Sequence, residues 1–170
     1  MSAPRSATTG AAAGVTLAPL DDALRPDVLA IEVRPDQVRF GGVPAAAVPA
    51  ADREPSRESV VILRDGVPVG YFQLDRRSVP GAPAGPHIIG LRALAIDCAA
   101  QGQGVGRAAL LALPAYVRAR FPERRVVALT VNVDNPAAIA LYARTGFKDA
   151  GTGVYDGGHA GPQHVLLLEV

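Results

Sequence analysis

The stretch LRALAIDCAAQGQGVGR, residues 91–107, decides the fold class more than any other part of the chain. An apolar run over Ile88–Ile96 predicts a strand, and glycines follow it at alternate positions 102, 104 and 106. The apolar spacing after them predicts a helix over Arg107–Phe121. Glycines let the main chain approach a ligand closely, and the first N–H groups of a helix carry partial positive charge without an internal partner. The stretch therefore indicates an anion site suited to a pyrophosphate.

Two other phosphate-binding turns fit these residues less well. A P-loop needs Gly-Lys-Ser/Thr, and Lys148 is the only lysine of the chain. A dinucleotide-binding turn follows the first strand of its unit and has an acidic residue about 20 positions later. Here several predicted strands precede the turn, and the glycine spacing differs. A tight glycine loop without any ligand stays open as the plain alternative.

A second informative stretch is NPAAIALYARTGF, residues 135–147, which follows an apolar strand pattern over Val126–Val133. It predicts a helix over Pro136–Thr145. Asn135 suits the N-cap of that helix, Pro136 suits its first turn, and Gly146 suits its end. The chain therefore repeats the order strand, turn and helix within its second half.

Together the two stretches resemble the GCN5-related N-acetyltransferase (GNAT) superfamily. Its phosphate motif, Gln/Arg-x-x-Gly-x-Gly/Ala, is matched by Gln101, Gly104 and Gly106. Its bacterial second motif, Asn-x-x-Ala-x-x-Leu-Tyr followed by Gly-Phe, is matched by Asn135, Ala138, Leu141, Tyr142, Gly146 and Phe147. The resemblance covers residues 88–147, whereas the rest of the chain fits by the order of its elements alone.

The remaining patterns agree with an α/β fold in which helices flank a mixed, mostly antiparallel central sheet. We expect one N-acetyltransferase domain over residues 15–170 and a disordered tail over residues 1–14, which also imitates a transit peptide in its Ser, Ala and Arg content. A helix is predicted over Asp21–Val33, and residues 41–58 suggest a loop or broken helix. The further strands are expected at Val15–Leu20, Val60–Leu63, Val67–Asp75, Phe147–Tyr155 and Val165–Val170.

The resemblance implies acetyl-CoA as co-substrate and no metal. The main chain of Leu94, Ala95 and Ile96 would pair with the pantetheine arm, and Asn135 would contact that arm. Tyr142 would act as general acid on the departing thiolate. The pyrophosphate would be held by Gln101, Gly102, Gln103, Gly104, Val105, Gly106 and Arg107.

Several of these residues also have plain structural explanations. Tyr142 suits the apolar face of a helix as a core residue, and Asn135 is already explained as a cap. The glutamate that relays the amine proton in many relatives falls close to Gly90, and the strand there has no acid. His87 at the strand entrance is more typical of a structural histidine, so we expect a water chain to relay the proton to a backbone carbonyl or a distant carboxylate. Cys98 is expected to behave as a small hydrophobic residue rather than as an acyl carrier.

The acceptor is indicated only by the first part of the chain. Residues 31–40 are similar to a segment of bacterial polyamine acetyltransferases, matched by Val33, Pro35, Asp36, Gln37 and Phe40. Carboxylates suited to a polycation gather in the same region at Asp21, Asp22, Asp27, Glu32 and Asp36, although a solvated helix face is the favoured explanation for them. We expect a small amine or polyamine acceptor. A peptide or protein amine, and a non-catalytic acyl-CoA-binding module, are the alternatives.

The bulk properties exclude several classes of function. A net charge of +1 gives no strong attraction to nucleic acid or to an anionic membrane, and no apolar stretch approaches the roughly 20 residues of a membrane span. Cys98 is the single cysteine, so an intrachain disulfide is impossible, which suits a cytoplasmic protein. The sequence leaves a homodimer open.

Overall fold

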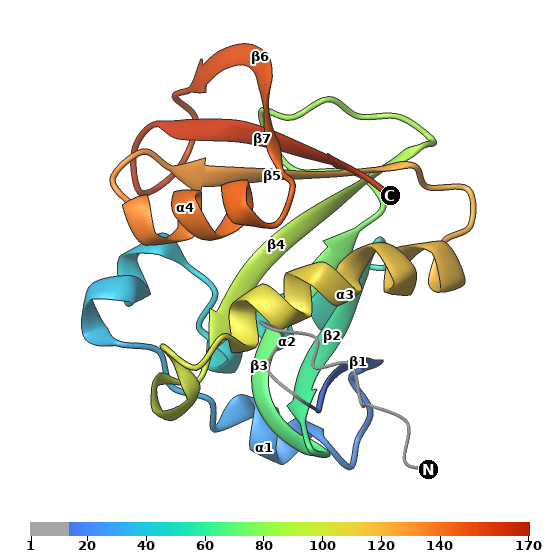
Figure 1. Cartoon of the computed structure of the whole chain (residues 1–170), viewed down its shortest axis with the longest axis vertical. Helices are drawn as coiled ribbons and strands as arrows, with labels where there is room; N and C mark the ends of the chain where they lie inside the picture. The colour runs from blue at the N-terminus through green and yellow to red at the C-terminus, as the bar shows by residue number, and fades with distance from the viewer. Residues whose placement is uncertain (1–13) are drawn as a thin grey trace, which may run out of the picture.

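A seven-stranded sheet in the order β1-β2-β3-β4-β5-β7-β6 runs through the computed structural model, which describes residues 14–170 (Figure 1). Every neighbouring pair is antiparallel except β4 and β5, which are parallel. This confirms the expected mixed, mostly antiparallel sheet flanked by helices. The tail predicted over residues 1–14 lies outside the described residues, apart from Gly14.

The elements follow one another along the chain with the bounds given next. The strands are β1 (Val15–Pro19), β2 (Arg57–Arg64), β3 (Val67–Asp75), β4 (Ile88–Ile96), β5 (Val126–Asn132), β6 (Lys148–Tyr155) and β7 (Gln163–Glu169). The α-helices are α1 (Arg25–Leu29), α2 (Pro44–Asp52), α3 (Val105–Arg120) and α4 (Pro136–Arg144), and the short 3₁₀-helices are η1 (Pro35–Phe40) and η2 (Cys98–Ala100).

Both faces of the sheet are covered, which explains the uninterrupted apolar run of β2. Val60 and Ile62 belong to the larger core that packs against α3 and α4, and Val61 points into the smaller core below α1 and α2. Successive residues of a strand face opposite sides, so burial on both sides needs an apolar residue at every position. All three of these side chains are buried.

The strands expected at Val60–Leu63 and Val67–Asp75 are confirmed within β2 and β3, and Asp65-Gly66 forms the hairpin turn between them. Both residues have positive φ, 51° and 81°, and they connect the paired ends Arg64 and Val67. A two-residue turn with two positive φ values has the backbone twist that an antiparallel hairpin needs, and Asp-Gly is among the sequences that adopt it most readily.

The first third of the chain differs from the expectation. The helix predicted over Asp21–Val33 is only one short helix, Arg25–Leu29, because Pro26 is tolerated in the first turn alone and so fixes where the helix begins. Residues 41–58, expected as loop or broken helix, contain α2. Pro44 occupies its first turn, and its alanines have high enough helix propensity to outweigh Pro49 in its interior.

The pairing of β4 with β5 covers only part of either strand, and this opens the sheet. Ile88–Gly90 pair with Val126–Ala128, and no pairing follows although both strands continue. Ala93 adopts a positive φ of 55° where the register between β3 and β4 shifts, which bends β4. The two strands therefore part beyond Gly90 (Figure 1), and the later main chain of β4 has no strand partner on the β5 side.

Candidate active site

A cleft of about 960 Å³ lies where β4 and β5 part. Its walls come from β4, from the glycine turn before α3, from α4, from η1 and from the residues between β6 and β7. The cleft thus brings together the two stretches that carry the sequence motifs. The predicted site residues that line it are Leu94, Ala95, Ile96, Gln101, Gly102, Gly104, Val105, Gly106, Arg107, Asn135 and Tyr142.

The glycine turn has the backbone that its sequence predicts. Gly102 and Gly104 have φ of 72° and 78°, a left-handed conformation that other residues adopt at a cost. Gly104 is the N-cap of α3, and its carbonyl accepts the first helical hydrogen bond from Ala108 at 3.0 Å. The N–H groups of the first turn of α3 therefore have no partner within the helix, and they form an anion-binding end beside the cleft.

The two glutamines of the turn have different roles. The Gln101 side chain donates to the Ile96 carbonyl at 3.0 Å and to Gln37 Oε1 at 2.8 Å, so it joins β4, the turn and η1. The Gln103 side chain does not line the cleft. It donates to the Ala99 carbonyl at 2.9 Å and accepts from Arg64, which leaves only its main chain for a ligand in the turn.

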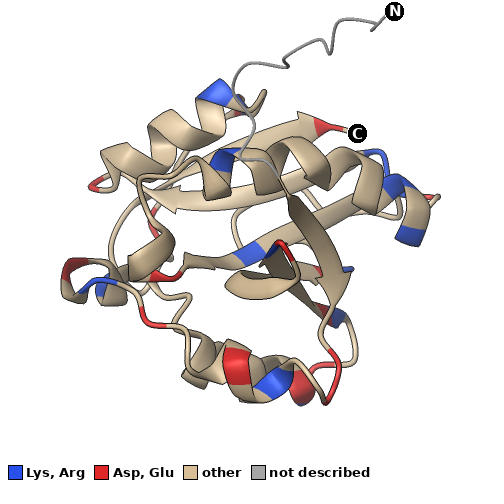
Figure 2. Ribbon diagram, turned by 60° about the horizontal axis from the view of Figure 1, so that its bottom comes forward, with Lys and Arg blue, Asp and Glu red and all other residues tan. Residues whose placement is uncertain are grey.

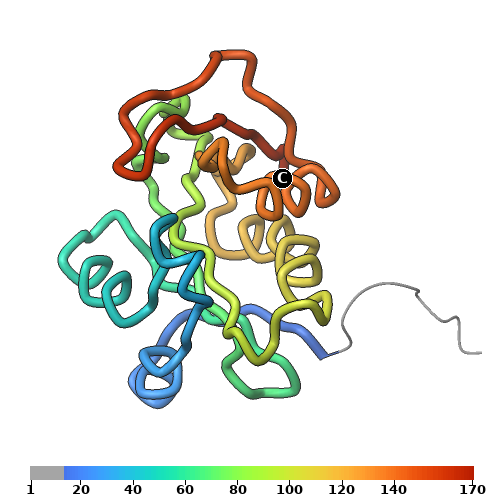
Figure 3. Tube along the Cα trace, turned by 90° about the vertical axis from the view of Figure 1, so that its left-hand side faces the viewer, coloured from blue at the N-terminus to red at the C-terminus, as the bar shows by residue number. Residues whose placement is uncertain are grey.

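The strip Leu94–Ile96 is the part of β4 that the resemblance assigned to the pantetheine arm. It lines the cleft and is unpaired on the β5 side. The connection from η1 to α2 passes close to it (Figure 3), since a Cβ on Gly42 would lie 3.1 Å from the Leu94 carbonyl oxygen. Gly42 has φ of 83°, so both space and conformation require glycine there.

Tyr142 is at once a core residue and a cleft residue. Its ring is only 7% exposed and packs edge-on against Phe147, with ring centroids 5.4 Å apart. Burial raises the pKa of Tyr142 above its usual range, so the hydroxyl stays protonated at neutral pH. Within residues 14–170 this hydroxyl has no hydrogen-bond partner, yet the residue lines the cleft. The arrangement suits a proton donor held ready for a ligand.

The structural explanation of Asn135 is confirmed, and Asp97 has a structural role as well. The Asn135 side chain caps α4 by accepting from the Ala138 N–H at 3.3 Å, while the residue also lines the cleft. The Asp97 carboxylate closes β4 by accepting from the Ala99 N–H at 2.9 Å and from the Glu32 N–H at 3.2 Å.

The position expected for a glutamate base is filled by main chain. A Cβ on Gly90 would lie 2.5 Å from the carbonyl carbon of Ser78, so the loop after β3 leaves no room for a side chain. His87 does not line the cleft, and its Nδ1 lies 2.9 Å from the Glu123 carbonyl oxygen, as expected of a structural histidine. Cys98 is exposed and does not line the cleft, so its position does not support a role as acyl carrier.

The acidic cluster expected to attract a polyamine does not form part of the cleft. Asp21 accepts from the Leu24 N–H at 2.8 Å, and Asp36 lies 3.5 Å from Arg34. Figure 2 shows acidic and basic residues interspersed around α1, as on a solvated surface. The reason is that α1 is a short helix whose buried residue, Val28, leaves its acids facing outward. The alternative of a solvated face is therefore correct for this cluster, which includes Asp22, Asp27 and Glu32.

Among residues 14–170, all charged side chains that line the cleft are arginines, apart from the ionisable His159. The sequence motifs did not point to Arg57 and Arg92, which lie at the end of the cleft away from the glycine turn. Gln73, Tyr155 and His159 also line it without a motif. Arg57, Gln73, Tyr155 and His159 were missed because they lie on strands and a loop that matched the superfamily by order alone. Arg92 was missed because, although it lies on β4, it is not a residue of either motif.

No helix within residues 14–170 combines the length and apolar character that crossing a bilayer requires. The same residues contain no gathering of three or more His, Cys, Asp or Glu side chains arranged to hold a metal ion.

Comparison with known proteins gives consistent matches. The sequence model described as "Acetyltransferase (GNAT) family" matches residues 25–147. The uncharacterized N-acetyltransferase YbbJ of Bacillus subtilis (strain 168) is 32% identical over 128 residues, which cover 74% of this chain and 80% of YbbJ.

Solved structures share the fold at lower identity. AAC(6')-Ib in complex with ribostamycin and coenzyme A has a TM-score of 0.73 and 21% identity, over 92% of this chain and 93% of that one. Spermidine N-acetyltransferase from Vibrio cholerae in complex with CoA and spermine has a TM-score of 0.68 and 15% identity, over 92% of this chain and 95% of that one.

Proposed function

Since the chain belongs to the acetyltransferase (GNAT) family, whose enzymes use acetyl-CoA as co-substrate, we propose that it acetylates the primary amine of a small molecule by direct transfer. The observation that carries the proposal is the single cleft in which the glycine turn, the open strip of β4 and Tyr142 meet. Acetyl-CoA supplies an acetyl group activated as a thioester. The residues of this chain bind it, orient it and move protons around it.

The chain has a binding element for each part of the co-substrate. The N–H groups at the start of α3 and the turn Gln101–Arg107 would hold the pyrophosphate. The main chain of Leu94–Ile96 would pair with the amides of the pantetheine arm as an added strand does, with Asn135 on the other side. An N–H of the same strip would stabilise the charge that develops on the carbonyl oxygen as the amine attacks.

Tyr142 is the proton donor of the proposal. Burial of the ring raises the pKa of Tyr142, so the hydroxyl remains protonated at neutral pH, and it has no competing partner among the described residues, so its proton is available to the departing sulfur. The attacking amine must lose a proton in turn. Water in the cleft would carry that proton, and His159 is the lining side chain able to accept it.

A small acceptor and a catalytic role are favoured over the alternatives. The end of η1 and the segment after β6 approach each other beside the cleft, since a Cβ on Gly41 would lie 3.9 Å from the His159 ring, and this restricts the space for a folded protein. A non-catalytic acyl-CoA-binding module has no need of a tyrosine hydroxyl without a structural hydrogen bond beside the site.

Calorimetric titration with coenzyme A tests the binding half of the proposal. Gly104→Asp places a carboxylate where the pyrophosphate would lie, and affinity should fall roughly 100-fold or more, because like charges at close range repel by about 4 kcal/mol near a protein surface. Gly153→Asp is the matched control, since Gly153 has the same φ of 78° in open space on β6 and carries the same backbone strain. Equal affinity of a folded Gly104→Asp protein would contradict the proposed site.

A further inference from the structure

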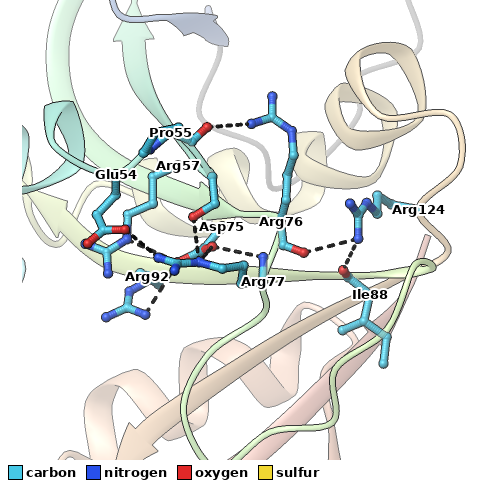
Figure 4. Close-up of polar contacts among 10 residues, drawn as sticks. Glu54, Pro55, Arg57, Asp75, Arg76, Arg77, Ile88, Arg92 and Arg124 are labelled. Carbon is cyan, nitrogen blue, oxygen red and sulfur yellow. Dashed lines mark hydrogen bonds and ion pairs between the residues drawn. The ribbon is translucent and has the colours of Figure 1, made fainter.

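Three arginines surround one buried carboxylate at the acceptor end of the cleft. Asp75 on β3 is 2% exposed, and its carboxylate lies 3.1 Å from Arg57 Nε, 3.6 Å from Arg92 and 3.9 Å from Arg77 Nε (Figure 4). The register explains the cluster, because Arg57 on β2 is the cross-strand partner of Asp75 and Arg92 on β4 pairs with Gln73, two residues away on β3.

The cluster has more positive than negative charge. Glu54 is the one further carboxylate in it, bound to Arg77, so two acids face three guanidinium groups. Burial alone would raise the pKa of Asp75, but hydrogen bonds from the Arg77 main chain, from Ser56 and from Arg57 outweigh it and hold that pKa below its usual range. Asp75 is therefore ionised at neutral pH, and one positive charge remains without a counterion.

That surplus charge faces the cleft. Arg77 is 64% exposed, bonds Ser56 and Glu54, and does not line the cleft, whereas Arg57 and Arg92 do. The Arg92 side chain makes no hydrogen bond to any residue in 14–170, and its ion pair with Asp75, at 3.6 Å, is long. Burial, and next the charge of Arg57, lower the pKa of Arg92, as expected of a guanidinium that lacks full compensation.

Arg92 lies on β4 close to the strip Leu94–Ile96, where the thioester is proposed to lie. Arg92 follows Gly90, the last residue of β4 paired with β5, by two positions, and it precedes the strip that begins at Leu94 by two positions. At roughly 3.3 Å per strand residue, it lies about 7 Å along β4 from the start of that strip. An anion bound there would be a few covalent bonds away from an amine that reaches the thioester.

We propose that the acceptor is an amine that itself carries a carboxylate, of the amino-acid class, and that Arg92 with Arg57 binds this carboxylate. The inference rests on the proposed acetyl transfer and specifies its substrate. An arginine fork binds a carboxylate through paired charge-assisted hydrogen bonds, which neither a neutral tail nor an ammonium tail can form. A polyamine would place a cation against the uncompensated charge and against a lining without carboxylates in the described residues.

Two sets of matched amines test the proposal on the unmodified protein with acetyl-CoA. The first set is 4-aminobutanoate, butylamine and putrescine, which differ only in the charge at the far end. The second is alanine, alaninamide and 1,2-diaminopropane, which covers the α-amino acids. The carboxylate should give the highest kcat/KM in at least one set, and its KM should rise with salt as the attraction is screened. A neutral or cationic member preferred in both sets overturns the inference.

Arg92→Gln tests the residue assignment. The KM of the preferred carboxylate substrate should rise by on the order of 10- to 100-fold, as for a lost hydrogen-bonded charge pair, and its affinity measured by calorimetry should fall equally. The KM of the matching neutral amine should rise much less, because that amine has no carboxylate for Arg92 to bind. Arg92→Lys should recover part of the loss. Arg77→Gln is the control, because it removes a charge from the same cluster outside the cleft.

The outcomes separate the inference from the function on which it rests. If no amine of either set is acetylated, the proposed transfer to small amines fails. If amines are acetylated but Arg92→Gln affects neutral and carboxylate substrates alike, or if Arg77→Gln raises the KM of the carboxylate substrate as much, then the carboxylate site fails alone. Should Arg92→Gln not fold, the two substrate sets still decide the question.

Discussion

Replacing Tyr142 with Phe and with Ala separates the two roles that the structure allows for this residue. Tyr142→Phe removes only the hydroxyl and keeps the ring that packs edge-on against Phe147 at 5.4 Å between centroids. The hydroxyl has no hydrogen-bond partner within residues 14–170, so its loss should change the free energy of unfolding by less than about 1 kcal/mol. Coenzyme A affinity should not change either.

The effect on catalysis should be much larger. If Tyr142 protonates the departing sulfur, Tyr142→Phe should lower kcat by roughly 100-fold or more, which corresponds to about 2.7 kcal/mol of barrier. Tyr142→Ala should lose activity as well. Because the ring is 7% exposed, its removal leaves a cavity in the larger core and should also cost about 3–5 kcal/mol of stability.

Urea unfolding and steady-state kinetics on the same protein samples measure both effects. The reasoning predicts a stable but slow Phe variant and an unstable, slow Ala variant. A Phe variant with unchanged kcat and unchanged stability would refute the acid role and leave Tyr142 as a core residue. A Phe variant that is slow because it binds coenzyme A poorly would also refute it, since the hydroxyl would then serve binding.

Two predictions concern the loop and carboxylate beside the cleft. Asp75→Asn should cost on the order of 3–5 kcal/mol in urea unfolding, because it leaves three guanidinium groups around an uncharged side chain. Folding lowers the pKa of Asp75, so the stability that its charge contributes is complete above its unfolded pKa of about 3.9 and is lost as pH falls through the lower folded value. An equal loss of stability in acid for the unmodified protein and for Asp75→Asn would contradict this. Gly90→Ala should destabilise the protein by about 1–3 kcal/mol, since its Cβ would lie 2.5 Å from the Ser78 carbonyl carbon, and a normal unfolding curve would show that the loop yields freely.

The half of the site that is proposed to bind the co-substrate was predictable because its signals are local. Gly102 and Gly104 adopt the positive φ values that their turn requires, and Asn135 caps the helix that its neighbours predict. Each of these features depends on residues adjacent in the chain. The combination of the two motifs was specific enough to give the fold class before any strand pairing was known.

The acceptor half was not predictable because long-range register creates it. Arg57, Asp75 and Arg92 are separated by 18 and 17 residues, and only the pairing of β2, β3 and β4 brings them together. The acidic residues near α1 were expected beside the acceptor but lie outside the cleft lining, since composition cannot say which residues of a short helix face the cleft. The α2 region was predicted only as loop or broken helix, because prolines obscured the helix propensity of its alanines.

Transfer of an acetyl group from acetyl-CoA to a small primary amine is the central claim, and mass spectrometry of a reaction mixture measures it directly. The purified protein, acetyl-CoA and the two amine sets are incubated together, and free coenzyme A and acetylated amine are quantified. We predict equal amounts of both products, formed only when protein, acetyl-CoA and amine are all present, and reduced strongly by Tyr142→Phe. Coenzyme A release without acetylated amine, acetyl groups retained on the protein, or no reaction with any amine would contradict the claim.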